Sequence, residues 1–332
     1  MQFDRLRRRE FITLIGGAAA WPLAAHAQQA GMRRVGLLTA SRPSDGEMQA
    51  RIRTLLQELQ RLGWIKGVNI QFDERWTTDD MELVRAHAIN LVELNPDVIV
   101  TNGGRTIPIF LQLTRSIPII VPGVGDPVQE GLAQSLAHPG GNVSGFTFFE
   151  PSVLGKILEI LKQIAPSTTR VAVIYNPNNA INVYALRLTE GFAGSLGIEP
   201  VRVPFQAIVE LERALEPMAN RGNGAIFSIP DLTVAQMRTQ ITELAARLRL
   251  PAIYSDRIVM TSGGLASYDA DRIDIYRGAA SYVDRVLRGE KVGDLPFQQP
   301  SKYNLFINLK TAKALGLTVP AALLATADEV IE

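Results

Sequence analysis

Residues 33–63 read RRVGLLTASRPSDGEMQARIRTLLQELQRLG, and they predict one β-strand followed by one α-helix. The run 35–38 is short and apolar, which is typical of a strand buried in a parallel sheet. Gly63 suits the end of the helix, because glycine is favoured just beyond a helix C-terminus. The apolar residues between them recur at helical spacing, and they are Met48, Ile52, Leu55, Leu56, Leu59 and Leu62.

The same alternation of strand and helix continues along the chain in two arrays. Further strands are predicted at 68–72, 98–100, 117–121, 143–148, 171–175, 198–203, 225–229 and 252–254. Further helices are predicted at 81–92, 153–164, 180–195, 207–219 and 232–248, with a helix start around Pro108. This alternation predicts an α/β protein with parallel sheets and helices on both faces. Two arrays of similar length predict two similar lobes, although no sequence repeat relates them.

The last part of the chain is less regular, and it predicts how the lobes are connected. It contains a predicted strand at 264–268, a helix at 273–287, an extended connector at 294–301, a strand at 305–307 and a helix at 309–315. Strands and helices near the C-terminus must pack against one of the two lobes already formed. The simplest path returns the chain to the first lobe and then takes it to the second again, so we expect three crossings between the lobes. Residues 32–146 plus 264–292 are then expected to form lobe 1, and residues 147–263 plus 300–332 to form lobe 2.

The N-terminus has the features of an export signal. Arg7-Arg8-Arg9-Glu10-Phe11-Ile12 supplies a basic start, and the apolar run 12–20 follows it. Ala25-His26-Ala27 provides a small-x-small cleavage site, which predicts a signal peptide over residues 1–27. The apolar run is shorter than the roughly 20 residues that span a bilayer. The paired arginines fit a twin-arginine signal and the apolar run fits the general secretory pathway, so the export route stays open.

The amino-acid composition argues against some classes of binding partner and favours one cellular location. The formal net charge of the whole chain is +1, and this near-neutral balance makes nucleic acid or an anionic membrane surface a poor partner. The chain has no cysteine, which excludes a lipid anchor on an N-terminal cysteine, a thiol nucleophile and a Cys-based metal site. An exported chain without such an anchor indicates a periplasmic protein that is not inserted in the membrane.

Polar turns follow the predicted strands, where helix N-termini bind ligands in open α/β sheets. The turn 101–106 has two glycines and flanking hydroxyls that could cradle a carboxylate, with Arg105 adding charge. Asp126 and Asp231 could meet an ammonium group. Each residue alone also fits ordinary helix capping, but together they favour a small polar or zwitterionic ligand. The candidate ligand-binding residues are Ser41, Asn102, Gly103, Gly104, Thr106, Asp126, Asn176, Asn179, Asp231 and Tyr268.

An enzymatic function finds no support in the motifs. Beyond the leader the chain has two histidines, His87 and His138, and neither has a nucleophile signature or a second histidine at metal-binding spacing. There is no phosphate-binding P-loop, and the run after Gly36 lacks the dinucleotide fingerprint. No catalytic residue, cofactor or metal is therefore predicted.

Six motifs occur in order along the chain: the leader 7–17, Gly125-Asp126-Pro127-Val128, Pro139-Gly140-Gly141-Asn142-Val143-Ser144-Gly145, Asn176-Pro177-Asn178, Gly263-Gly264-Leu265-Ala266-Ser267-Tyr268 and the tail 308–317. Together they resemble one family, the ABC-transporter substrate-binding proteins of the group that binds tryptophan and other aromatic amino acids. The resemblance implies a type I periplasmic-binding-protein fold, in which three hinge strands join two Rossmann-like lobes and the ligand lies between them. It also implies a membrane permease with a cytoplasmic ATPase as partner. Arg105 departs from the small or apolar residue expected there, which predicts an altered ligand choice.

The sequence thus predicts a periplasmic receptor of an ABC import system that binds a small amino-acid-like ligand. Receptors that close around a ligand and dock on a permease are usually monomers, so a monomer is expected. Two alternatives stay open at this point. One is a periplasmic sensor subunit that reports ligand occupancy to a signalling system, and the other is an exported α/β enzyme.

Overall fold

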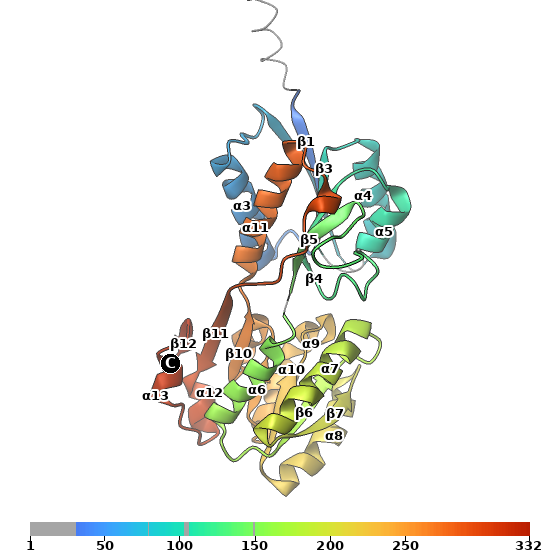
Figure 1. Cartoon of the computed structure of the whole chain (residues 1–332). Helices are drawn as coiled ribbons and strands as arrows, with labels where there is room; N and C mark the ends of the chain where they lie inside the picture. The colour runs from blue at the N-terminus through green and yellow to red at the C-terminus, as the bar shows by residue number, and fades with distance from the viewer. Residues whose placement is uncertain (1–30, 79, 103–105, 149) are drawn as a thin grey trace, which may run out of the picture. The chain divides into compact units, whose positions relative to one another are not determined.

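A computed structural model describes residues 31–332 except 79, 103–105 and 149, and it contains two β-sheets (Figure 1). The chain divides into two compact units. One unit holds the described residues up to 120 together with 280–292, and the other holds those of 121–279 together with 293–332. The predicted leader at 1–27 lies outside the described residues.

The first sheet has five strands in the order β2-β1-β3-β4-β5. They are β1 (Arg33–Ala40), β2 (Ile70–Thr77), β3 (Val98–Asn102), β4 (Ile119–Val124) and β5 (Val143–Thr147). The helices between these strands are α3 (Gly46–Arg61), α4 (Met81–Glu93) and α5 (Thr106–Leu113). The pairs β1–β2, β1–β3 and β3–β4 are parallel, as the βα alternation predicts.

The second sheet has seven strands in the order β12-β11-β10-β9-β8-β6-β7. They are β6 (Arg170–Tyr175), β7 (Glu199–Pro204), β8 (Gly224–Ser228), β9 (Ala252–Tyr254), β10 (Ala266–Ala270), β11 (Tyr303–Asn308) and β12 (Glu329–Ile331). The strands β6 to β10 follow the same 2-1-3-4-5 order as the first sheet, which is the flavodoxin-like order of doubly wound folds. The two arrays read from the sequence therefore share one topology.

Helices cover both faces of the second sheet, because successive residues of each strand point to opposite faces. Val171 and Val173 of β6 belong to one apolar cluster, whereas Ala172 and Ile174 belong to another. The first cluster includes α6 (Val153–Ile164) and α7 (Ala180–Ala193), and the second includes α8 (Ile208–Arg221) and α10 (Arg238–Arg247). Each fully buried aliphatic side chain in these clusters contributes roughly 1.5–3 kcal/mol through the hydrophobic effect.

Most of the predicted elements are confirmed, and the differences are local. The second sheet is mixed rather than all parallel, because β11 runs antiparallel to β10. The strand predicted at 68–72 is found at 70–77, since Val68 lies in a turn and is 69% exposed. The helix predicted at 232–248 is two helices that meet at Met237, α9 (Leu232–Gln236) and α10.

The structure also contains short elements that the sequence did not indicate. The described chain also contains the 3₁₀ helices η1 (Gly194–Leu196), η2 (Arg257–Ser262) and η3 (Val292–Asp294). The remaining helices are α11 (Arg272–Leu287), α12 (Leu309–Ala314) and α13 (Ala321–Leu324), of which α13 was not predicted, and neither was β12. The observed units also divide the chain differently from the predicted lobes, because 121–146 and 264–279 group with the second unit, although β5 pairs in the first sheet. The predicted lobe limits stay a prediction.

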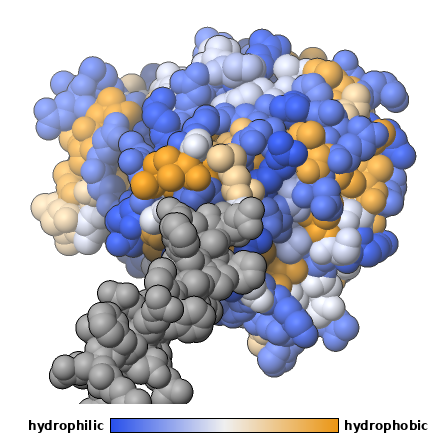
Figure 2. Space-filling model, turned by 90° about the horizontal axis from the view of Figure 1, so that it is seen from above, coloured by the Kyte–Doolittle hydropathy of each residue, from blue (hydrophilic) through white to orange (hydrophobic). Residues whose placement is uncertain are grey.

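The surface of the described residues is mostly polar on the face shown in Figure 2. None of the described helices is long and apolar enough to cross a membrane. The face shown in Figure 2 is largely hydrophilic, with hydrophobic residues in small groups among the polar ones. Scattered exposed apolar side chains of this kind are normal for folded proteins.

Candidate functional site

A polar cluster lies at the carboxyl ends of β6 and β8, which are neighbours in the second sheet although β7 intervenes in sequence. Asp231 is its centre. Its Oδ1 accepts from Asn176 Nδ2 at 3.2 Å and from the Thr233 backbone N–H at 2.8 Å, and its Oδ2 accepts from Asn179 Nδ2 at 2.9 Å. This is the topological switch point of the sheet, where open α/β folds bind ligands.

The cluster is internally satisfied. Burial alone would raise the pKa of Asp231, but the hydrogen bonds from Asn179, Thr233 and Asn176 outweigh it and hold that pKa below its usual value. Asp231 also caps the N-terminus of α9. The carboxylate is therefore ionised and already has partners on both oxygens.

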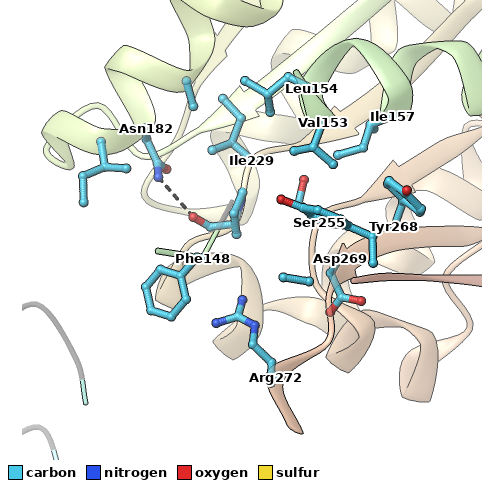
Figure 3. A pocket seen from close by; sticks show the side chains of 15 residues that line it. Phe148, Val153, Leu154, Ile157, Asn182, Ile229, Ser255, Tyr268, Asp269 and Arg272 are labelled. Atoms are coloured by element: carbon cyan, nitrogen blue, oxygen red, sulfur yellow. Dashed lines mark hydrogen bonds between the residues drawn. The ribbon is translucent and has the colours of Figure 1, made fainter. Parts of the chain in front are cut away.

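Asn182, on α7, joins the two loops that carry this cluster. Its Oδ1 accepts from the Asn176 backbone N–H at 3.1 Å, and its Nδ2 donates to the Pro230 carbonyl at 3.1 Å (Figure 3). Asn182 is 1% exposed, so both bonds form away from water, where an unpaired amide would be costly. The β6–α7 and β8–α9 loops are thus held in one fixed arrangement.

A pocket lies beside this cluster, entirely within the second unit (Figure 3). Figure 3 shows Asp269, Arg272 and Phe148 along one side of it and apolar side chains of α6 along the other. Its lining residues are Phe148, Val153, Leu154, Ile157, Ile181, Asn182, Ala185, Ile229, Pro230, Ser255, Tyr268, Asp269, Ala270, Arg272 and Tyr303. An apolar wall with a few convergent polar groups is the usual composition of a small-molecule site.

Two glycines of the segment 123–125 make room for pocket side chains. Gly123 has φ +125°, and a Cβ there would lie 2.3 Å from Cε1 of Phe148. A Cβ on Gly125 would lie 2.5 Å from Cδ1 of Ile181. Both distances are far below van der Waals contact, so the absence of a side chain at 123 and 125 lets Phe148 and Ile181 reach the pocket.

Arg272, the first residue of α11, is the cation of the pocket. Its guanidinium carbon lies 4.4 Å from the centroid of the Phe148 ring, in a cation–π contact. Within the described part of the chain, no ion pair or hydrogen bond occupies its side chain, in contrast to Arg277 one turn later, which pairs with Asp274 at 2.6 Å. The guanidinium is therefore available to an anionic group.

Asp269, at the end of β10, is the buried anion of the pocket. It is 6% exposed, and its Oδ2 accepts from the Arg257 backbone N–H at 3.0 Å. Its Oδ1 has no hydrogen-bond partner among the described residues. Burial raises the pKa of Asp269 to about 7; the charge of Arg272 lowers it, Asp256 raises it, and Arg257 lowers it.

Two tyrosines complete the wall. Tyr268 and Tyr303 stack with ring centroids 5.5 Å apart and an interplanar angle of 20°. The Tyr303 hydroxyl accepts from the Glu150 backbone N–H at 2.9 Å, and burial raises the pKa of Tyr303 to about 12. Both rings stay neutral at physiological pH and present apolar surface to a ligand.

A comparison with known protein families agrees with this geometry. The model of the family described as "ABC transporter substrate binding protein" matches residues 43–331 of the chain. The chain belongs to this family. It is a family of substrate-binding proteins rather than enzymes, and membership implies a small-molecule ligand and a permease partner. Such proteins typically act outside the cytoplasm.

Individual relatives agree with this assignment. The chain is 28% identical over 262 residues to a tyrosine-binding protein of Clostridioides difficile, which covers 79% of this chain and 75% of the relative. A conserved domain protein from Vibrio cholerae superposes with a TM-score of 0.78 at 28% identity, covering 90% of this chain and 99% of that one. An ABC domain from Streptococcus pneumonia in complex with L-Trp gives 0.79 at 22% identity, with the same coverage. More distant sugar-binding and repressor structures share the type I periplasmic-binding-protein fold.

In this substrate-binding protein, the predicted residues of the first sheet are engaged in local hydrogen bonds. Ser41 Oγ donates to Asp45 Oδ2 at 2.6 Å, and Asn102 Oδ1 accepts from the Ala40 backbone N–H at 2.9 Å. Thr106 is fully buried, and its Oγ1 accepts from Thr101 Oγ1 at 2.8 Å. Gly103 and Gly104, with Arg105, lie outside the described residues.

The other predicted residues belong to the second unit. Asp126 Oδ1 accepts from the backbone N–H groups of Val128 and Gln129, so it caps a turn rather than a helix. Asn176, Asn179 and Asp231 come together in the polar cluster, and Tyr268 lines the pocket. Ligand contact by each of these residues stays a prediction.

The sequence analysis missed Asp269, Arg272, Phe148 and Tyr303. A signal for Asp269 was present, because a carboxylate that directly follows the small and apolar run 264–268 is unusual in a buried strand. Arg272 gave no such signal, since an arginine at a helix start reads as a surface residue. Its role depends on Phe148, which is distant in sequence.

Proposed function

We propose that this substrate-binding protein is the receptor of an ABC importer for an amino acid with an aromatic side chain. The observation that carries the proposal is the pocket of the second unit, where a guanidinium without an ion pair among the described residues lies among aromatic rings. The residues concerned are Arg272, Phe148, Tyr268 and Tyr303.

Each part of such a ligand has a matching group in the pocket. The planar guanidinium of Arg272 presents donors that fit a carboxylate in a bidentate geometry. Tyr268, Tyr303 and Phe148 offer rings for stacked or edge-to-face contact with the ligand side chain. The tyrosine-binding relative and the structure in complex with L-Trp support this ligand class.

The location and partners follow from the same proposal. The receptor acts in the periplasm as a monomer that is not inserted in the membrane, and it delivers its ligand to a membrane permease with a cytoplasmic ATPase. The export motif of residues 1–27 and the family membership support this. The near-neutral charge of the chain gives no basis for nucleic acid as a partner.

Thermal unfolding of the purified chain tests the ligand class. L-Tyrosine, L-tryptophan and L-phenylalanine should stabilise it more than L-leucine, L-lysine or glucose, by about 2.7 kcal/mol at a concentration of 100 times Kd. Arg272→Gln should weaken binding of the best aromatic amino acid by about 10- to 100-fold, because a hydrogen bond to a charged group is lost. Arg277→Gln is the matched control on the same helix, and it should leave Kd unchanged. Equal stabilisation by glucose or leucine, or none by any amino acid, would contradict the proposal.

A further inference from the structure

Asp269 is buried, and one of its carboxylate oxygens has no hydrogen-bond partner among the described residues. The residue is 6% exposed, and among the described residues the Arg257 backbone N–H is the sole hydrogen-bond donor to its two carboxylate oxygens, while Oδ1 has no donor. Burying a carboxyl group that lacks partners is unfavourable, because the lost hydration is not replaced. Groups of this kind that face a cleft concentrate at functional sites.

We infer that Asp269 determines specificity in this receptor: its unpartnered oxygen accepts the ammonium group of the ligand, so the pocket selects amino acids over deaminated analogues. The inference rests on the proposed function, and it adds a residue and a chemical requirement to it. Asp269 lies three positions before Arg272, and both line the same pocket. The pocket therefore holds one anion and one cation, as a zwitterion requires.

The arginines around Asp269 favour the ionised form of its carboxyl group, and an ionised carboxylate binds an ammonium group more strongly than a neutral hydroxyl. Arg272 approaches from α11 and Arg257 from η2, and both favour the ionised carboxylate. Asp256, at the start of η2, opposes ionisation, and the Tyr303 hydroxyl on β11 is neutral near pH 7. If the ligand carboxylate pairs with Arg272, the positive charge of Arg272 is partly neutralised and stabilises the Asp269 carboxylate less. The ammonium group of the same ligand then supplies the positive charge next to Asp269.

Binding should then release a proton. Burial raises the pKa of Asp269 to about 7 in the free receptor, so this carboxyl is about half protonated at that pH, whereas pairing with an ammonium requires the ionised form. The apparent affinity for an amino acid should fall by about tenfold for each pH unit below 7. A ligand without the amine should show no such dependence.

The experiment is isothermal titration calorimetry of the full mature chain with two ligand pairs. The pairs are L-tryptophan with indole-3-propanoate and L-tyrosine with 3-(4-hydroxyphenyl)propanoate. Wild type should bind the amino acid about 100-fold more tightly than its analogue, and Asp269→Asn should remove most of this preference by weakening amino-acid binding alone. Asp274→Asn is the control, since it removes an equal charge from the exposed first turn of α11.

Proton release is read from the same titrations in buffers of different ionisation enthalpy. Wild type should release close to one proton at pH 6 and almost none at pH 8.5, whereas Asp269→Asn should release none at either pH. Binding of an amino acid with an unchanged preference in Asp269→Asn overturns the inference. So does loss of the preference in Asp231→Asn instead, because that would assign the ammonium to the polar cluster. If wild type binds neither member of either pair, the proposed function fails together with the inference.

Discussion

Asp231 and Asp269 lie at the same edge of the second sheet, yet their surroundings are opposite. Asp231 accepts hydrogen bonds from Asn176, Asn179 and Thr233, and these bonds lower its pKa against the effect of burial. Asp269 is more deeply buried, has one backbone donor and a raised pKa. The difference shows that a carboxylate at the expected position of a ligand site can already have all its hydrogen bonds satisfied by groups of the protein.

The two residues therefore have different energetic roles. Asp231 stabilises the loops that shape the site, since it satisfies two amides and caps a helix. Asp269 destabilises the free protein, because its negative charge is shielded from water without sufficient compensation. A ligand that supplies the missing partner would relieve this cost, which is how a binding site gains affinity for a charged group.

The largest expected effect concerns the stability of the ligand-free protein against pH. The pKa of Asp269 is raised from 3.8 to about 7 on folding, so the unfolded chain loses this proton first as pH rises. The contribution of Asp269 to the free energy of unfolding should therefore fall as pH rises from about 4 to about 7. Measured between pH 5 and pH 8, this fall should amount to roughly 3 kcal/mol. Urea unfolding of wild type and Asp269→Asn at several pH values measures this difference, and other titrating groups cancel in it. Parallel pH profiles for the two proteins would show that Asp269 is not buried unpaired, and the comparison with Asp231 would break.

The second prediction concerns Asp231. Asp231→Ala should lower the free energy of unfolding at pH 7 by about 2 kcal/mol, because two side-chain amides lose their acceptor and α9 loses its cap. The folded-state pKa of Asp231 is depressed, so its contribution is present above its unfolded pKa of 3.8 and is lost as pH falls through the lower folded value. The pH dependence is thus opposite in sign to that of Asp269.

Chemical denaturation of Asp231→Ala and Asp269→Ala at pH 7 compares the two residues directly. Asp231→Ala should be the less stable variant, whereas Asp269→Ala should unfold at a urea concentration equal to or above that of wild type. A reversed order would mean that the hydrogen bonds around Asp231 contribute little.

The sequence predicted the fold better than it predicted the site, and individual elements show why. The strand 171–175 and the helix 153–164 were confirmed, because buried parallel strands and amphipathic helices have distinct apolar patterns. The direction of β11 was not predicted, since an apolar run reads the same for parallel and antiparallel pairing. In the site, Asn176 and Asp231 were found from their position after strands. Asp269 was not, because its burial depends on η2, which lies beside β10 only in the folded chain.

The smallest expected effect extends the comparison to the stacked tyrosines. Tyr303→Phe should lower the free energy of unfolding by about 1 kcal/mol, because the Glu150 backbone N–H loses the hydroxyl that accepts from it. Tyr268→Phe should cost less than about 0.5 kcal/mol, since its hydroxyl has no hydrogen-bond partner among the described residues and the variant keeps the ring stack. Urea unfolding of both variants measures these values, with each tyrosine serving as the control for the other. A larger loss for Tyr268→Phe would show that unpartnered polar groups in this pocket also stabilise the free protein, and it would weaken the argument that Asp269 is kept for a ligand.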